Sequence, residues 1–296
     1  SEGNVGGFLH KKTVEQLQKL GASDDQGNVD IDTGAVIFNS EMLQALYQLV
    51  DTKEKFAAYV NESTRLSFYA DFLYPLASDS TLEQYYKETP EGDFTPELEQ
   101  CRTELWSVLH PYQMKLIRMS PAAFIHFGTT KELRELMTER MDEFYYLGWT
   151  SNINTNREEA DFAASNSYVS PNAEIGKGSY LEDCMIRNKS QIGEECVISG
   201  VTLDGQTIPA HTVLHGLKQQ NGKFVVRMYG VSDNPKEALL FGKTLPMPLW
   251  EAAIYPVCDS MEEAVHQTLE AWREGFPIRE DAISLKDSFN QADLSA

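Results

Sequence analysis

The sequence has few cysteines and few basic residues for its length, and each shortage argues against a class of protein. Only 4 of its 296 residues are cysteines, and Cys101, Cys184, Cys196 and Cys258 include no closely spaced pair. This spacing argues against a disulfide framework, a zinc knuckle or a redox motif, and it favours a reducing, cytoplasmic compartment. The chain has 25 Lys and Arg against 45 Asp and Glu, which gives a formal net charge of −20. Nucleic acid and anionic membrane surfaces are therefore poor candidate partners.

Long apolar runs and glycine-rich phosphate loops are also missing from the sequence. No apolar run approaches the length of a membrane span. Neither G-x-G-x-x-G nor a P-loop occurs, and no Ser or Cys lies in a nucleophile elbow. These absences argue against a self-contained nucleotide site of those types. The composition, 42% hydrophobic and 24% charged, is that of a folded globular protein.

The first part of the chain alternates short apolar segments with amphipathic ones, as a mixed α/β domain does. Helices are expected to begin near Val14, Ser40, Thr95 and Thr129, the last with a capping box completed by Glu132. Strands are expected at residues 5–8, 29–32, 35–38, 114–119 and 124–127. No complete strand, glycine-rich loop and helix come first, so we expect this α/β domain to be entered midway.

From Val169 onward, branched apolar residues recur every six positions. Residues 169, 175 and 181 carry the first set and, after a slip of one, residues 186, 192 and 198 carry the second. Gly176 and Gly193 each follow an isoleucine of this series. A period of six suits neither a lone helix nor a flat strand, whereas it suits a triangular parallel β-helix with small residues at the corners. The run predicts about three coils.

The last third begins with a hairpin signal at Asn221-Gly222 and continues with an alternating strand at 224–229. A further strand at 253–257 and a helix after Ser260 complete a segment expected to cap the β-helix. The predicted fold is therefore a partial α/β domain at 1–160, a short left-handed parallel β-helix at 161–217 and an α/β cap at 218–296.

Lys11 and the Asp32-Thr33-Gly34 turn are the first candidate binding residues. Lys11 follows an apolar strand-like segment and precedes a helix, where a lysine can reach a phosphate group. By spacing alone, a solvated lysine on a turn is the more common interpretation. Asp32 can accept hydrogen bonds from sugar hydroxyls, or it can cap its own turn, and the sequence leaves both open.

Asp71 is the third candidate, because it lies within the apolar and aromatic stretch 66–74. A buried carboxylate is costly unless it is paired or binds a metal ion. Magnesium takes one or two protein carboxylates and completes its shell with substrate phosphates. The alternatives are a helix Asp that faces solvent, or one that pairs with Arg65.

Taken together, these segments resemble the sugar-nucleotide pyrophosphorylases, and most closely the fucose-1-phosphate guanylyltransferase family, including its bifunctional fucokinase form. The resemblance rests on stretches that span nearly the whole chain: FLHK at 8–11, DIDTG at 30–34, FLYPL at 72–76, SPAAFIHFGTT at 120–130 and YGVSDNPK at 229–236. His10 and Lys12 depart from the wider family's Phe-x-Glu-Lys-Pro pattern.

The resemblance implies a reaction of GTP with fucose 1-phosphate that gives GDP-fucose and pyrophosphate, with Mg²⁺ as cofactor. It implies that Lys11 holds the sugar phosphate, that Asp32 and Thr33 contact the sugar and that Asp71 shares the metal. The family's glycine-rich nucleotide loop and the kinase domain have no counterpart in the sequence. We therefore expect a fragment that transfers nothing at a useful rate by itself, with possible self-association through the β-helix.

Two other functions remain open from the residues. Hexapeptide β-helices also form acyltransferases with a catalytic histidine near the coil surface, and His211 or His215 is then the candidate. The same pair, four residues apart, is a minor candidate for metal ligation. The second of these functions is that of a non-catalytic module that binds a sugar phosphate or oligomerises.

Overall fold

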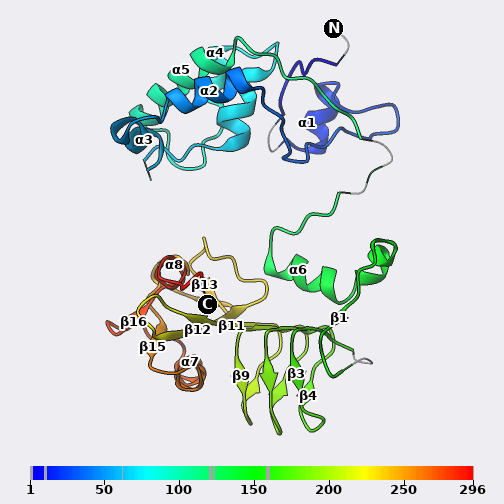
Figure 1. Cartoon of the computed structure of the whole chain (residues 1–296), viewed down its shortest axis with the longest axis vertical. Coiled ribbons are helices and arrows are strands. Elements are labelled where there is room, and N and C mark those ends of the chain that lie inside the picture. The colour runs from blue at the N-terminus through cyan, green and yellow to red at the C-terminus, as the bar shows by residue number, and fades with distance from the viewer. Residues whose placement is uncertain are drawn as a thin grey trace. The chain divides into compact units, whose positions relative to one another are not determined.

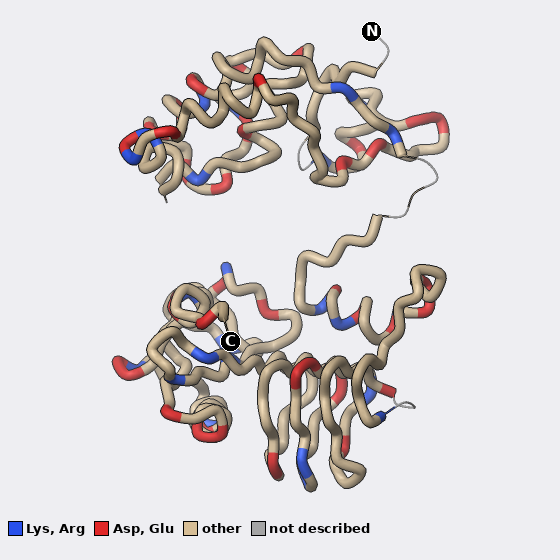
Figure 2. The backbone as a smooth tube through the Cα atoms, in the orientation of Figure 1, with Lys and Arg blue, Asp and Glu red and all other residues tan. Residues whose placement is uncertain are grey.

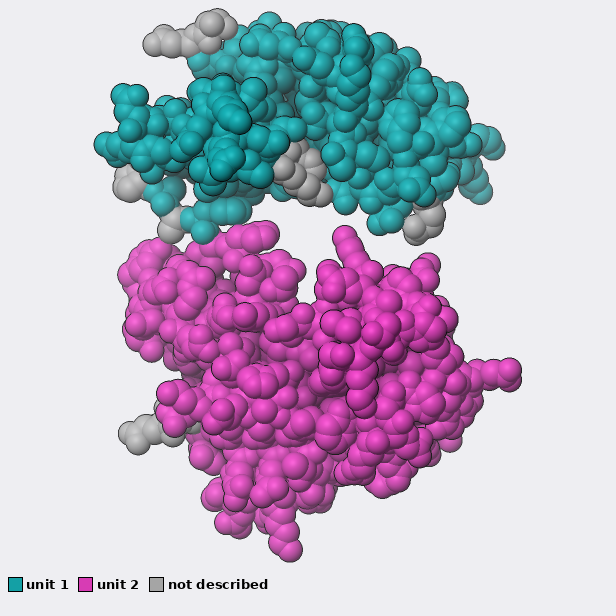
Figure 3. Space-filling model, turned by 180° about the vertical axis from the view of Figure 1, so that it is seen from behind, with its two compact units in different colours: residues 1–124 teal, residues 125–296 magenta. Residues whose placement is uncertain are grey.

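The computed structural model describes residues 3–9, 12–61, 63–119, 122, 124–157 and 161–295. The chain forms two compact units, Ser1–Phe124 and Ile125–Ala296 (Figure 3). The second unit is a β-helix extended by a mixed sheet, and the first is mostly helical (Figure 1). Within the described residues no helix has both the length and the apolar character needed to cross a membrane.

The first unit is built around the helix α5, which carries the apolar stripe expected after Thr95. Leu98, Leu105 and Leu109 are almost fully buried, and the last two pack with Met42 and Leu73. Thr95 caps the helix and Pro96 occupies its first turn, as predicted. The helical elements of this unit are α1 (Val14–Lys19), α2 (Ser40–Gln48), α3 (Lys53–Tyr59), η1 (Phe68–Leu73), η2 (Tyr74–Leu76), α4 (Leu82–Lys87) and α5 (Pro96–Leu109).

The strands predicted in the first unit were wrong as strands, because these segments are extended but find little partner backbone. Residues 3–6 lie between two other extended segments, with Val5 N donating to Met114 O at 2.9 Å and Ser78 N donating to Val5 O at 3.0 Å. Among the described residues of this unit, only isolated bridges result, Asn4 with Lys115 and Ser23 with Val29. Several apolar side chains of these segments stay exposed, such as Ile37 at 87% and Ile117 at 75%. An alternating pattern thus predicted extended backbone, whereas a strand also needs a neighbour.

The predicted parallel β-helix is confirmed, and its coils explain the six-residue period. The branched residues stack in register on three sides, as Leu181 on Ile198, Ile175 on Ile192 and Ile186 on Leu203. Cys184 N donates to Ser167 Oγ, 17 residues earlier in the sequence, which is the length of one coil. A coil is therefore one residue shorter than three six-residue sides, and this is why the six-residue period slips by one. At Gly193 an added Cβ would lie 2.4 Å from Ala210 N, so the corner needs glycine.

One side of the β-helix continues into an eight-stranded mixed sheet in the order β1-β2-β5-β8-β11-β12-β15-β16. The hairpin of β11 and β12 turns at the predicted Asn221-Gly222. The strands are β1 (Asn152–Ile153), β2 (Ala163–Ser165), β3 (Tyr168–Val169), β4 (Glu174–Ile175), β5 (Tyr180–Glu182), β6 (Met185–Ile186), β7 (Gln191–Ile192), β8 (Val197–Ser199), β9 (Thr202–Leu203), β10 (Thr207–Ile208), β11 (Thr212–Lys218), β12 (Phe224–Gly230), β13 (Leu239–Leu240), β14 (Lys243–Thr244), β15 (Tyr255–Cys258) and β16 (Ala282–Ile283).

Helices cover both faces of this sheet. The elements are α6 (Thr130–Met137), η3 (Met141–Leu147), α7 (Met261–Arg273) and α8 (Leu285–Asn290). α7 packs on one face, where Thr268 Oγ1 donates to Val226 O at 3.0 Å, while α6 and α8 lie on the other (Figure 1). α6 begins with the predicted capping box, and its Arg134 donates to Gly178 O at 2.9 Å. The helix at 130–137 therefore packs with the β-helix, within the second unit.

Candidate functional site

The segment that carries Lys11 is anchored by an aromatic contact just before it. His10 and Lys11 lie outside the described residues, but Phe8 is described and partly buried. Its ring stacks on that of Tyr69, with centroids 6.1 Å apart and planes 10° apart. Tyr69 belongs to η1, so Phe8, three residues before Lys11, is held against this helical element of the first unit.

The Asp32-Thr33-Gly34 turn reaches the same tyrosine. Gly34 has φ +74°, and an added Cβ would lie 3.0 Å from the Tyr69 hydroxyl oxygen, so both conformation and contact favour glycine. Asp32 Oδ1 accepts a hydrogen bond from Gly34 N at 3.1 Å, the turn-capping role expected as the alternative. The side chains of Asp32 and Thr33 are exposed, and a carboxylate can accept several hydrogen bonds. Turn capping and ligand binding are therefore compatible.

Tyr69 is the residue that sequence reasoning missed in this region. It contacts both Phe8 and the turn at Gly34, and 38% of its surface stays exposed. A partly exposed aromatic ring beside a polar turn is a common feature of small-molecule sites. The only signal in the sequence was its position within the aromatic stretch 66–74, which equally suits a core residue.

Asp71 does not join this group, because its carboxylate is fully buried in a structural ion pair. Asp71 Oδ1 accepts from Arg102 Nε at 2.7 Å, and Oδ2 accepts from Ser67 N at 2.6 Å. Arg102 also donates to Tyr85 O and Glu88 O, each at 3.0 Å. The partner is thus Arg102 on α5 rather than Arg65, and neither a solvent-facing Asp nor the Arg65 pair describes the site.

A metal ion at Asp71 would have to displace Arg102, which would leave a buried guanidinium without its counter-charge. In the described part of the chain, no group of three or more His, Cys, Asp or Glu side chains could hold a metal ion. Asp71, paired in this way, therefore does not fit the Mg²⁺ that the resemblance implies. The metal role of Asp71 stays a prediction without support from this geometry.

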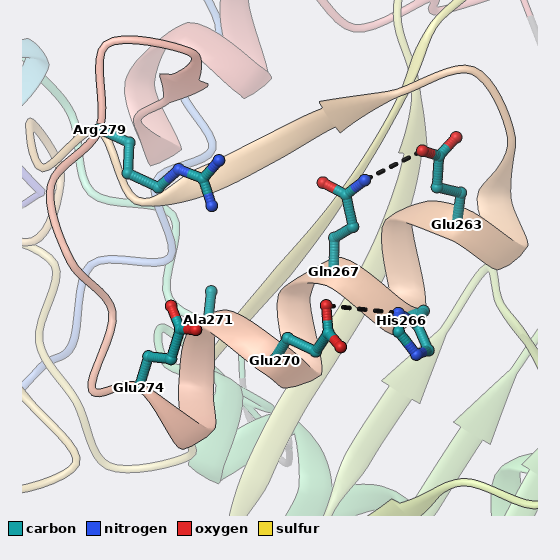
Figure 4. A pocket seen from close by; sticks show the side chains of 7 residues that line it. All are labelled: Glu263, His266, Gln267, Glu270, Ala271, Glu274 and Arg279. Carbon is teal, nitrogen blue, oxygen red and sulfur yellow. Dashed lines mark hydrogen bonds and ion pairs between the residues drawn. The ribbon is translucent and has the colours of Figure 1, made fainter.

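A polar pocket on the second unit lies along α7 (Figure 4). Gln267 Nε2 donates to Glu263 Oε1 at 2.9 Å, and His266 Nδ1 lies 3.6 Å from Glu270 Oε2. The carboxylates in its lining outnumber the cations, as they do along the chain as a whole (Figure 2). Arg279 is paired with Asp281 at 2.7 Å. An acidic lining of this kind repels phosphate, so the pocket is a poor sugar-phosphate site.

The two histidines considered for acyl transfer lie in different surroundings. His211 is exposed, and its Nδ1 lies 3.4 Å from Glu195 Oε2. His215 lies on β11 and is partly buried, and its Nδ1 accepts a hydrogen bond from Arg227 Nη2. Burial, and after it the charge of Arg227, lowers the pKa of His215 from 6.5 to about 4. His215 is therefore neutral at physiological pH.

This lowered pKa predicts a loss of stability in mild acid. Between pH 6.5 and 4 the unfolded chain binds a proton at His215 that the folded chain refuses, so the free energy of unfolding falls as the pH falls. We expect about 2 kcal/mol of this loss at pH 5, and none above pH 7. Urea unfolding at pH 7 and pH 5 measures it, with His215→Gln expected to lose the effect and His266→Gln, an exposed control, to keep it. An equal pH dependence in all three proteins would contradict the assignment.

The chain thus combines a mostly helical unit with a second unit in which a β-helix continues into a mixed sheet. Comparison with known families gives a match: residues 1–260 match the family described as "Fucose pyrophosphorylase domain". The chain belongs to this family.

Two curated relatives resemble the chain over most of its length. Fucose-1-phosphate guanylyltransferase of Homo sapiens is 23% identical over 326 aligned residues, which cover 89% of this chain and 52% of the relative. The Mus musculus protein of the same name is 22% identical over 315, covering 88% and 53%. The chain thus spans about half the length of these relatives. No solved structure matches it.

Proposed function

We propose that the chain supplies the sugar-phosphate half of a fucose-1-phosphate guanylyltransferase. The observation that carries this proposal is the family match over residues 1–260, joined by two relatives that bear this name. The contacts around Tyr69 support it, because Phe8, which precedes Lys11, and Gly34, in the turn of Asp32, both lie against this one aromatic side chain. The family match favours this function over an acyltransferase that uses His211 or His215.

The reaction is an in-line displacement at the α-phosphorus of GTP. A phosphate oxygen of fucose 1-phosphate forms the new P–O bond, and pyrophosphate leaves with the electron pair of the bond that breaks. Lys11 contributes a positive charge to the sugar phosphate, while Asp32 and Thr33 accept and donate hydrogen bonds to the sugar hydroxyls. These residues bind and orient the nucleophile, and holding it close to the α-phosphorus in the right geometry lowers the activation barrier.

We further propose that this chain by itself binds fucose 1-phosphate without turning it over. The sequence has no glycine-rich, basic loop of the kind that cradles a nucleoside triphosphate. Calorimetry with fucose 1-phosphate and a pyrophosphate-release assay with GTP test this proposal on the same sample. Binding with no release supports it. Robust release contradicts the inactivity, and an absence of binding contradicts the sugar-phosphate role.

Changing the Asp32 carboxylate is expected to weaken this binding moderately. Asp32→Asn replaces a charged acceptor by a neutral one, a loss of about 1 kcal/mol or roughly fivefold in Kd. Asp25→Asn is the matched control, since Asp25 is an exposed acid outside the turn. Calorimetric titration of the three proteins with fucose 1-phosphate gives the comparison. Equal Kd values for both variants would remove Asp32 from the site.

A further inference from the structure

Arg102 and Arg134 show how this fold treats a buried arginine. Arg102 is fully buried and pairs with Asp71 at 2.7 Å. Arg134 is 2% exposed, and it pairs with Glu139 at 2.8 Å and Glu195 at 3.5 Å. Removing a guanidinium from water is unfavourable, so a neighbouring carboxylate is the usual compensation.

Arg227, in the middle of β12, lacks this compensation. It is partly buried, and its Nε is shielded from solvent without a hydrogen-bond partner. Within the described ranges, no carboxylate lies at ion-pairing distance from its guanidinium, and Nη2 donates to the neutral imidazole of His215. Burial lowers the pKa of Arg227 from its ordinary value, whereas a paired carboxylate would raise it. A positive charge is thus held in the protein without a negative one.

The register of the sheet places Arg227 at the end of a polar row. Arg227 pairs with His215, His215 with Ser199, and Ser199 with Glu182. Residues paired across neighbouring strands project from the same face. This is the face away from the β-helix core, because Ile198 and Leu214, the neighbours of Ser199 and His215, point into that core.

The row has opposite character at its two ends. Arg227 and the imidazole N–H of His215 offer donors, while Glu182, which is exposed, offers acceptors and lies 3.5 Å from the Ser199 hydroxyl. Strands are spaced about 4.8 Å apart, so Glu182 and Arg227 are roughly 14 Å apart. A parallel row of apolar residues, with Val197, Val213 and Tyr229, runs beside it. Figure 1 shows α6 and α8 on this side of the sheet and α7 on the other.

We propose that this polar row is a binding site for a small phosphorylated metabolite that carries free hydroxyl groups. The phosphate lies against Arg227 and His215, where the guanidinium supplies charge-assisted hydrogen bonds. The hydroxyl-bearing part extends across Ser199 toward Glu182, whose carboxylate accepts its hydrogen bonds. This site belongs to the second unit and uses none of the residues assigned to fucose 1-phosphate.

The thermal stability of the protein without ligand distinguishes a structural role of Arg227 from a binding role. If Arg227 were a structural residue, its removal would destabilise the fold, as removal of a paired arginine does. If its charge instead awaits a ligand, Arg227→Gln is expected to leave the thermal transition unchanged or to raise it. Arg187→Gln is the matched control, because Arg187 makes the same charge change on an exposed β-helix turn.

Binding to the full chain is tested with inorganic phosphate and ribose 5-phosphate as probes. Ribose 5-phosphate is expected to bind more tightly than phosphate, and both are expected to shift the NMR signals of the His215 ring. Arg227→Gln weakens both at least tenfold, Glu182→Gln weakens ribose 5-phosphate alone about threefold, and Arg187→Gln changes neither.

Several results would overturn the site. One is a wild-type protein whose His215 signals do not respond to either probe. Another is a response that survives Arg227→Gln, or that Arg187→Gln reduces equally, because both point to diffuse charge. A large drop in the thermal transition of Arg227→Gln without ligand would assign Arg227 a structural role. None of these outcomes bears on fucose 1-phosphate binding at the first unit, which is measured separately with Lys11 and Asp32 variants.

Discussion

Replacing Asp71 by asparagine is expected to destabilise the first unit by about 3–5 kcal/mol. The change leaves the fully buried guanidinium of Arg102 without its counter-charge, and the lost contact joins η1 to α5. Thermal unfolding followed by circular dichroism measures the effect. Because the chain has two compact units, we expect the transition of the first unit to move while that of the second stays in place.

Asp30→Asn is the matched control for this prediction. It also removes an acid from an arginine pair, but Asp30 and Arg118 are 54% and 67% exposed, and such exposed pairs contribute little to stability. The double variant Asp71→Leu with Arg102→Met should recover much of the loss, since an apolar pair leaves no uncompensated charge. If Asp71→Asn were no more harmful than Asp30→Asn, the structural role would be refuted. A metal role for Asp71 instead predicts that Mg²⁺ stabilises the wild type and not the variant.

The second large effect concerns Lys11. Lys11→Met is expected to weaken fucose 1-phosphate binding by about 10- to 100-fold, because a hydrogen bond to a charged group contributes about 1.5–3 kcal/mol. Lys12→Met removes the same charge one residue later and is expected to leave Kd within about twofold. Calorimetry gives both values, and circular dichroism shows whether each variant is folded. Equal weakening by the two variants would mean that diffuse positive charge, rather than Lys11, holds the phosphate.

Packing decided between the interpretations of Asp71, whereas both interpretations of Asp32 are compatible with the structure. The sequence left Asp32 open between capping and binding, and the structure shows the capping bond to Gly34 with the side chain still exposed. For Asp71 the sequence left a buried carboxylate and a solvent-facing one both open, and the structure shows the buried one. Its partner, Arg102, is 31 residues away, and no local pattern connects the two positions.

The strands expected in the first unit show a related limit. Alternation of apolar and polar residues describes which side chains share a face, but it does not supply a second strand. Residues 35–38 and 114–119 are extended without a full ladder, and Ile37 and Ile117 remain exposed. Backbone pairing depends on segments far apart in the chain, so it could not be derived from each segment alone.

The sequence by itself determined the β-helix, including its stacking residues and its corner glycines. In such a repeat each coil contacts only its neighbours, so a local spacing of six fixes which side chains meet. It also determined the helix caps at Thr95 and Thr129, which depend on residues within one turn. Only the tertiary structure decided which charge meets which: Asp71 meets Arg102, whereas Arg227 meets no carboxylate of the described residues. The reason is that the environment of a charge is set by every chain segment folded around it.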